Sequence, residues 1–341
     1  MTIYDIAKAL DISYGTVSMA LSGNKKIAEK TRVRVQEFAT QHGFTPNKGA
    51  RNLRLQKSSL VAVIVVDIAS DFWAGVVSAI EETLGGAYNL IICNSCGSVE
   101  KEQKIIASLV ALRIGGVIVQ PADTRHIDHL SELNRAGVPT VLFECTGNDE
   151  LSFVKGNDYV AARRAVEELT IRGHQRIALL SNSQPQITGP VDREKGFLDA
   201  AAAAGISELC HVSNLQHPSI TRLDEVFTDR VRDFSAVVCI DDCFVIPLLK
   251  ILRREKLDCP NDISLLCWRN RVVLDMMMPA VSHFDIPVKK MGRIAAEFIM
   301  QRQSGQSFVL QEFIDEPLII GESITQISKA DGAVTGANSR G

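Results

Sequence analysis

Long apolar runs are missing from this chain of 341 residues. No stretch of about 18 consecutive apolar residues occurs, which argues against a transmembrane helix. An apolar N-terminal signal stretch and a lipidation motif are also missing. We therefore expect the protein to be cytoplasmic and to have no membrane partner.

Motifs of common enzyme classes are missing as well. The first apolar run, residues 60–66, is not followed by a G-x-G-x-x-G turn, and the chain has no Walker loop. No Ser/His/Asp arrangement and no His/Glu metal spacing stands out. We therefore expect a protein that binds rather than catalyses, without a cofactor or a metal site. In the pair Gly173-His174, the histidine is expected to be structural.

The chain has eight cysteines, most of them in or beside predicted strands. Residues of this kind in a cytoplasmic protein are typically reduced thiols of the core. Cys93 and Cys96 have CxxC spacing, and Cys239 and Cys243 form another close pair. Because neither pair has the flanking context of a redox or zinc motif, these roles remain the less favoured alternative.

The first 23 residues predict two short helices joined by a tight turn. Thr2 is placed as an N-cap, and residues 11–13 are too few to connect anything but two crossed helices. Ser13 can cap the second helix. An apolar stripe at helical spacing marks the first helix: Ile3, Ile6, Ala7 and Leu10.

The second helix has one apolar face and one exposed face. Val17, Ala20 and Leu21 face the first helix, and the opposite face would look into a DNA major groove. That face consists of Tyr14, Gly15, Ser18 and Met19.

A third helix is predicted from about Glu29 to His42, with a stop at Gly43. Its apolar stripe consists of Val35, Phe38, Ala39 and His42. Up to residue 60 the chain has ten Lys and Arg against four Asp and Glu, a net of +6. The whole chain is at −3, so the remainder sums to −9. A cationic head on an acidic body is typical of a protein that binds a phosphate backbone, although a basic adaptor with a solvated face is an alternative.

Residues 2–55 resemble the DNA-binding end of the lactose-repressor (LacI/GalR) family of bacterial transcription regulators. The motifs that carry the resemblance stand in the family's order: Thr16-Val17-Ser18, Leu21-Ser22-Gly23-Asn24, Thr31-Arg32, Gly43-Phe44-Thr45-Pro46-Asn47 and Ala50-Arg51-Asn52-Leu53-Arg54. The resemblance and the exposed helix face together predict these DNA-binding residues: Thr2, Ser13, Tyr14, Gly15, Thr16, Ser18, Met19, Asn24, Asn47, Ala50, Arg51, Leu53 and Arg54.

Met19 departs from the family pattern, which usually has an Arg that reads a guanine edge at this position. A thioether has no pair of donors for guanine O6 and N7. We therefore expect the operator to differ from the family's usual half-site at that base. One helix-turn-helix reads only a few base pairs, so a pseudo-palindromic operator and a homodimer are expected.

Residues 46–57 are predicted to be a hinge helix or linker. The segment is too short and polar to be a stable helix alone. The resemblance implies that it folds on DNA and inserts Leu53 between base pairs of the minor groove. Arg51 and Arg54 flank this wedge, as expected for a minor-groove binder. A flexible linker is the alternative interpretation.

From Leu60 onward, continuous apolar runs alternate with helical patterns, which predicts parallel βαβ units. The predicted strands are residues 60–66, 89–93, 116–120, 139–143, 176–181, 236–240 and 263–267. Our fold prediction is an all-α helix-turn-helix head, residues 1–45, followed by an α/β, two-lobed domain of the periplasmic-binding-protein type (Rossmann-like) over residues 58–328. The lobe boundary is placed near Asp158, the return near Phe284, and a disordered tail at residues 329–341.

The resemblance also implies a small-molecule effector bound between the lobes. Loops at the carboxyl ends of strands supply the candidates. These are Phe72, Trp73, Glu144, Arg193, Asp241 and Arg269. The alternative to effector binding is packing within the lobe for Trp73 and a surface ion pair for Arg193.

Arg269 stands where the family has an Asp that binds effector hydroxyls. A guanidinium donates and cannot accept, so either the effector is anionic, or Arg269 pairs with Glu144 or Asp241 and fills the site.

The sequence therefore predicts a DNA-binding transcription regulator, expected to be a repressor, whose operator affinity depends on a small molecule. A regulator of the same fold that is switched by a protein partner is the alternative, and an enzyme is less favoured.

Overall fold

The computed structural model describes residues 1–44, 58–215, 220–268 and 272–327. The chain divides into two compact units, Met1–Ser58 and Ser59–Gly341. The predicted hinge, residues 46–57, and the predicted tail, residues 329–341, both lie outside the described residues. Within the described part of the chain, no helix is long and apolar enough to cross a bilayer.

Residues 1–44, the described part of the first unit, contain three helices, α1 (Ile3–Leu10), α2 (Tyr14–Leu21) and α3 (Glu29–Gln41). Thr2 and Asp5 form a capping box, in which Asp5 N donates to Thr2 Oγ1 (3.2 Å) and Thr2 N donates to Asp5 Oδ2 (2.7 Å). Ser13 Oγ accepts from Thr16 N (3.0 Å) at the start of α2. Both predicted caps are confirmed, because each depends on residues only three apart.

The core of this unit is built from all three helices. Its buried residues are Ile6, Leu10, Val17, Ala20, Val35 and Ala39. The placement of His42 on the apolar stripe of α3 was wrong, because this residue is exposed and its ring stacks on Phe38 with a centroid distance of 4.2 Å. Gly43 follows with a φ of 62°, a left-handed conformation that suits the end of a helix.

The second unit begins with a sheet in the order β11-β5-β4-β3-β1-β2, with all neighbouring pairs parallel. Its strands are β1 (Leu60–Val65), β2 (Asn89–Asn94), β3 (Gly116–Val119), β4 (Thr140–Phe143), β5 (Ser152–Gly156) and β11 (Gln311–Ile314). We call this sheet and its helices the first lobe.

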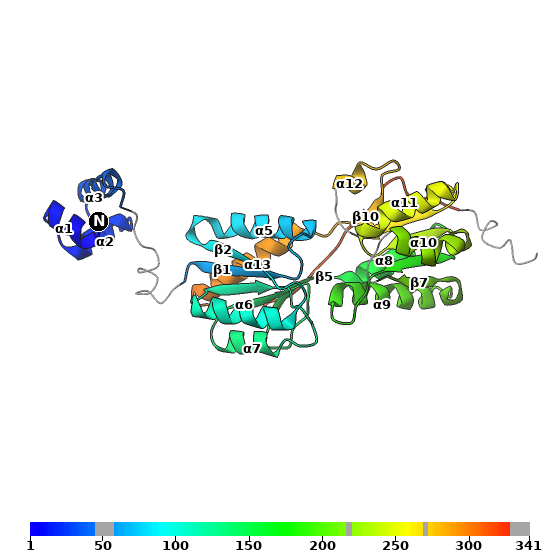
Figure 1. Ribbon diagram of the computed structural model, residues 1–341, viewed down its shortest axis with the longest axis horizontal. Helices are drawn as coiled ribbons and strands as arrows, with labels where there is room; N and C mark the ends of the chain where they lie inside the picture. Colours follow the sequence, from blue (N-terminus) through cyan, green and yellow to red (C-terminus); the bar gives the residue numbers. More distant parts are fainter. Residues whose placement is uncertain (45–57, 216–219, 269–271, 328–341) are drawn as a thin grey trace, which may run out of the picture. The chain divides into compact units, whose positions relative to one another are not determined.

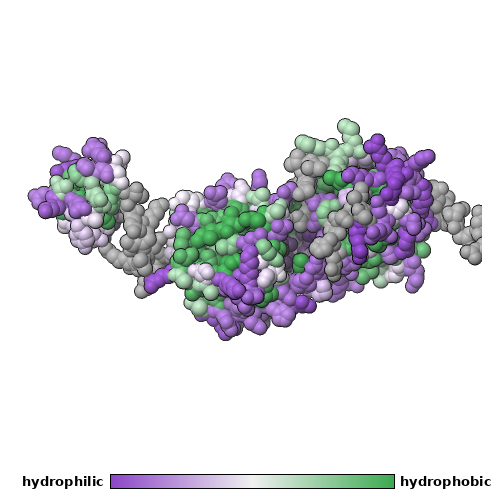
Figure 2. Space-filling model, viewed as in Figure 1, coloured by the Kyte–Doolittle hydropathy of each residue, from purple (hydrophilic) through white to green (hydrophobic). Residues whose placement is uncertain are grey.

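Two pairs of helices cover the two faces of this sheet (Figure 1). One pair is α5 (Asp71–Leu84) and α13 (Val288–Gln303), and the other is α6 (Val99–Ala111) and α7 (Asp128–Arg135). Alternate residues of β1 supply the two cores: Val61 and Val63 face α5 and α13, whereas Ala62 and Ile64 face α6 and α7. Figure 2 shows apolar side chains gathered on the visible face of this lobe.

The second lobe has a sheet in the order β12-β10-β9-β8-β6-β7, in which only β12 is antiparallel to its neighbour among the described strands. Its strands are β6 (Ile177–Ser181), β7 (His211–Asn214), β8 (Ala236–Cys239), β9 (Ser264–Trp268), β10 (Ser282–Phe284) and β12 (Leu318–Ile319). Its helices are α8 (Asp158–Ile171), α9 (Thr188–Ala203), α10 (Ile220–Phe227), α11 (Val245–Arg254) and α12 (Val272–Asp275).

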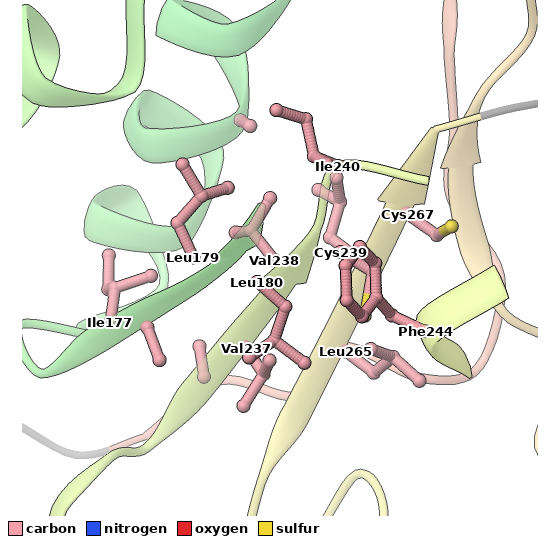
Figure 3. Packing of buried hydrophobic residues seen from close by; sticks show 14 of the residues in the cluster. Ile177, Leu179, Leu180, Val237, Val238, Cys239, Ile240, Phe244, Leu265 and Cys267 are labelled. Carbon is pink, nitrogen blue, oxygen red and sulfur yellow. The ribbon is translucent and has the colours of Figure 1, made fainter. Parts of the chain in front are cut away.

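Side chains of β6, β8 and β9 fill the core of the second lobe (Figure 3). His174 is buried in the same lobe, with ring nitrogens 3.0 Å from both Ser235 Oγ and Thr325 O, which confirms its structural role. Burial lowers the pKa of His174. The core interpretation of the cysteines was wrong for Cys96 and Cys243, which are exposed.

In the part of the chain that the structure describes, the backbone passes between the lobes three times: from β5 to α8, from β10 to α13, and from β11 to β12. The predicted fold class is confirmed, and the seven predicted strands correspond to β1, β2, β3, β4, β6, β8 and β9. Strands β5, β7, β10 and β11 were missed because polar residues interrupt each of them, and β12 was missed because it has only two residues.

Candidate DNA-reading face and buried charge cluster

Helix α2 presents the exposed face that the sequence predicts. Val17 and Ala20 are buried against the other helices, whereas Tyr14 and Met19 are each 36% exposed. Gly15 is exposed and Ser18 is half-buried. The second helix of a helix-turn-helix enters the DNA major groove, so these four residues form the candidate reading face.

Tyr4 of α1 belongs to the same surface, and the sequence analysis missed it. Its ring stacks on Tyr14 with a centroid distance of 4.8 Å and an interplanar angle of 22°. Tyr4 is 70% exposed, so the pair presents an aromatic edge to solvent. The available signal was the position of Tyr4 outside the apolar stripe of α1.

Several other predicted DNA-binding residues shape the turns around α2. Thr16 Oγ1 lies 2.8 Å from Ser13 Oγ, and Asn24 Oδ1 accepts from Lys26 N (3.0 Å). Their DNA contacts remain predictions. Five more predicted residues lie outside the described residues: Asn47, Ala50, Arg51, Leu53 and Arg54.

The second candidate site is a buried charge cluster where the chain passes between the lobes. Arg193 of α9 is 5% exposed, and its Nε donates to Asp158 Oδ1 (2.7 Å) at the start of α8. Its Nη1 donates to the carbonyl of Ile240 (3.0 Å), and its guanidinium lies 5.4 Å from the ring centroid of Trp268. The direct ion pair of Arg193 is therefore with Asp158, which the sequence analysis did not single out for this role.

Lys155, on β5, is the second buried cation and is 1% exposed. Its ammonium donates to Asp158 and to the carbonyl of Gly156, and it pairs with Asp192 at 3.2 Å. Burial alone lowers the pKa of Lys155, but the carboxylates of Asp158 and Glu144 raise it above its ordinary value. Lys155 is therefore charged.

Asp158 accepts from both buried cations and is fully buried itself. Burial raises the pKa of Asp158, but Arg193 and Lys155 outweigh burial and lower it below the ordinary value. Arg193 and Lys155 thus share one carboxylate that is ionised at neutral pH.

Glu144 and Glu316 are the remaining carboxyl groups of the cluster. Glu144 follows β4 with a φ of 57°, and its Oε1 accepts from Gly156 N (3.2 Å). Glu316 Oε2 accepts from the indole N–H of Trp268 (3.1 Å). The other oxygen of Glu316 is buried and has no hydrogen-bond partner among the described residues.

Burial, and then repulsion from Asp158, raises the pKa values of both glutamates, that of Glu316 to about 8. Glu316 is therefore protonated at neutral pH, and its carboxyl group can donate a hydrogen bond. Gly156 makes room for it, since a Cβ at this position would lie 2.0 Å from Glu316 Oε1.

The other predicted effector residues lie around this cluster or apart from it. Asp241 Oδ1 accepts from Cys243 N (3.2 Å). Trp73 is 4% exposed within the first-lobe core, where it packs on Phe72 and Phe143 and donates to Gln120 Oε1 (3.1 Å). Arg269 lies outside the described residues. The effector contacts of all six residues remain predictions.

Lys155, Glu316 and Trp268 are members of the cluster that were not predicted from the sequence. A lysine inside a short buried strand was the one available signal, because an unpaired buried ammonium is costly. The described residues contain no group of His, Cys, Asp and Glu that could hold a metal ion. The cluster can instead hold polar groups by hydrogen bonds and charge.

Comparisons with known proteins match both units. Residues 2–47 match the family model of bacterial regulatory proteins, lacI family, and residues 166–324 match that of the periplasmic binding protein-like domain. The chain is thus similar to LacI family regulators in its first unit and to periplasmic binding proteins in its second unit. The chain is 25% identical over 320 residues to catabolite control protein A of Priestia megaterium, covering 91% of this chain and 96% of the relative.

Two further comparisons extend over both units. The HTH-type transcriptional regulator GalR of Escherichia coli (strain K12) is 26% identical over 303 residues, covering 88% of each chain. The crystal structure of the lac repressor dimer bound to operator and the anti-inducer ONPF has a TM-score of 0.84 at 19% identity, and covers 95% of this chain and 99% of that one. The likeness to the lac repressor structure shows that this chain has the same fold.

Proposed function

We propose that this protein is a member of the LacI family and a sequence-specific DNA-binding transcription regulator, acting as a repressor, whose operator affinity changes when a small molecule binds between the two lobes. The observation that carries the proposal is the α1–α2 unit, whose caps and core hold Tyr14, Ser18 and Met19 on an exposed face. Relatives with this architecture are named as transcriptional regulators, and one is a repressor dimer bound to operator.

The basic charge of the head supports DNA binding. Lys25, Lys26 and Lys30 are exposed in the turn after α2 and at the start of α3. Cations on this side of the reading helix can contact phosphates and fix its register in the groove. Sequence readout then depends on α2.

DNA binding is tested by selection of duplexes from a random pool with the full chain. We expect an enriched pseudo-palindrome, because two helices of a dimer read half-sites about one helical turn apart. Gel-shift titrations with the selected site and a scrambled site then measure the specificity ratio at fixed salt. A pool that shows no enrichment, while the protein remains folded by circular dichroism, contradicts the proposal.

Repression is tested on a promoter template that carries the selected site. Added protein should lower transcription from that template and leave a template with the scrambled site unaffected. Increased transcription would show an activator instead.

The proposed effector site is the buried charge cluster, because it joins segments at which the chain passes between lobes. A neutral polyol can donate hydrogen bonds from its hydroxyl groups to the carboxyl group of Glu144. A carboxylate or phosphate can instead pair with Arg269, or compete with Asp158 for Arg193. The proposed anionic effector, an acidic sugar derivative or a carboxylate, follows from these arginines.

Thermal unfolding of the full chain with sugars, sugar phosphates, nucleosides and carboxylates tests for an effector. A compound that binds the folded state raises the melting temperature by mass action. The same compound should change operator affinity and should be recovered unchanged, which distinguishes a sensor from an enzyme. If no compound in the panel binds and a protein ligand alters operator affinity, the alternative of a protein-switched regulator is favoured.

A further inference from the structure

The reading helix α2 has none of the side chains that make bidentate contacts with bases. Its sequence, YGTVSMAL, contains no charged residue, no His and no Asn or Gln. Guanine is read in the major groove by Arg or Lys, and adenine by the amide of Asn or Gln. Helix α2 therefore lacks the usual means of reading either purine.

Helix α2 has few polar groups, and some of them contact residues of the turn between α1 and α2. Thr16 Oγ1 lies against Ser13 Oγ at 2.8 Å, and the ring of Tyr14 is stacked on Tyr4. What α2 presents outward is the hydroxyl groups of Tyr14 and Ser18 and the thioether side chain of Met19.

Met19 is the large aliphatic side chain of this face, with 36% of it exposed. Long side chains on a helix lie back over the preceding turn, which for Met19 is the turn of Gly15. Gly15 has no side chain, and a Cβ there would meet only Ser13 Oγ, at 3.7 Å. The space over Gly15 beside Met19 is thus open, and the Met19 side chain could contact a small apolar group there.

Thymine carries such a group, since its 5-methyl projects into the major groove and is read by apolar contact. We propose that Met19 reads the 5-methyl group of a thymine, so that each half-site has an A·T pair opposite Met19. This inference rests on the proposed DNA binding, and specifies which base the reading helix selects.

The test uses the selected operator and replaces each thymine with deoxyuridine, which removes the methyl group alone. At one symmetric position we expect the full chain to lose about four-fold in affinity per half-site, the value of one buried methyl group. A cytosine at that position should weaken binding, and 5-methylcytosine should recover part of the loss.

Variants then assign the effect to Met19. Met19→Ala should bind the thymine and deoxyuridine sites equally well, whereas Met19→Leu keeps the apolar contact and should still prefer thymine. Val33→Ala is the matched control, because Val33 is an exposed apolar residue of α3 (42% exposed) outside the reading face. It should retain the full deoxyuridine effect.

The outcomes separate this inference from the proposed function. If no duplex is enriched, DNA regulation itself fails. If an operator is selected but deoxyuridine has no effect at any position, thymine reading is wrong while DNA binding stands. If Met19→Ala keeps the full deoxyuridine effect, another residue reads the methyl group and the role of Met19 is overturned.

Discussion

Replacing Glu316 with Gln should remove a pH dependence of stability that originates in the buried charge cluster. Gln has the shape of a protonated Glu and can still accept from the indole of Trp268, as Glu316 Oε2 does at 3.1 Å. It cannot release a proton. The substitution therefore tests the ionisation of Glu316 with little change in packing.

The direction of this pH dependence follows from the pKa of Glu316, which rises from 4.5 to about 8 in the folded protein. Between these values the folded protein holds a proton that the unfolded chain releases, so the free energy of unfolding of the wild type falls as pH rises. The loss begins near pH 4.5 and levels off above pH 8. The variant does not share it.

An isolated group would contribute about 1.4 kcal/mol for each pH unit that separates its folded and unfolded pKa values. The titration of Glu316 is linked to the charges of Glu144 and Asp158, which reduces this value. We therefore expect the free energy of unfolding of the variant to rise by about 2 to 3 kcal/mol relative to the wild type between pH 5 and pH 8. His174 contributes with the opposite sign below pH 6.5, because burial lowers its pKa, but it does so equally in both proteins.

Urea unfolding at pH 5, 6, 7 and 8 measures this difference, followed by tryptophan fluorescence and circular dichroism. Glu297→Gln is the control, since Glu297 is exposed on α13 and the same chemical change there should leave the wild-type pH dependence in place. A difference between Glu316→Gln and the wild type that is constant across this range would refute the reasoning.

Three further predictions concern the DNA complex. Met19→Arg should create a preference for guanine at one position per half-site, worth about 1–3 kcal/mol for a bidentate contact, and selection with both proteins measures it; identical motifs would contradict it. Leu53→Ala should weaken binding to the specific site by a few kcal/mol and reduce the DNA bend, whereas binding to random DNA should change little. Gel-shift and bending assays measure these effects. An equal loss of affinity for specific and random DNA would show that Leu53 is a linker residue. Sedimentation at micromolar concentration should show a dimer, because apolar side chains gather on the first lobe (Figure 2) and paired half-sites need two heads. A 37 kDa species alone, with and without operator, would exclude the dimer.

The sequence alone determined the local architecture of the DNA-binding unit. Thr2 caps α1 and Ser13 caps α2 through residues three positions away, and Val17 and Ala20 are buried because of their helical spacing. Long apolar strands were equally readable, since strands covered on both faces exclude polar residues. Contacts of this kind depend on neighbours in the chain or on a repeating pattern.

Only the tertiary structure showed which residues form the charge cluster and how they pair. Arg193 and Asp158 are 35 positions apart, and Glu316 is 48 positions from Trp268, so their pairing depends on how β5, α8, α9 and β9 pack. Short polar strands such as β5 carried no readable pattern, and Lys155 is buried there only because Asp158 and Asp192 lie beside it. The protonation of Glu316 arises from burial next to like charges, which a sequence does not specify before the chain folds.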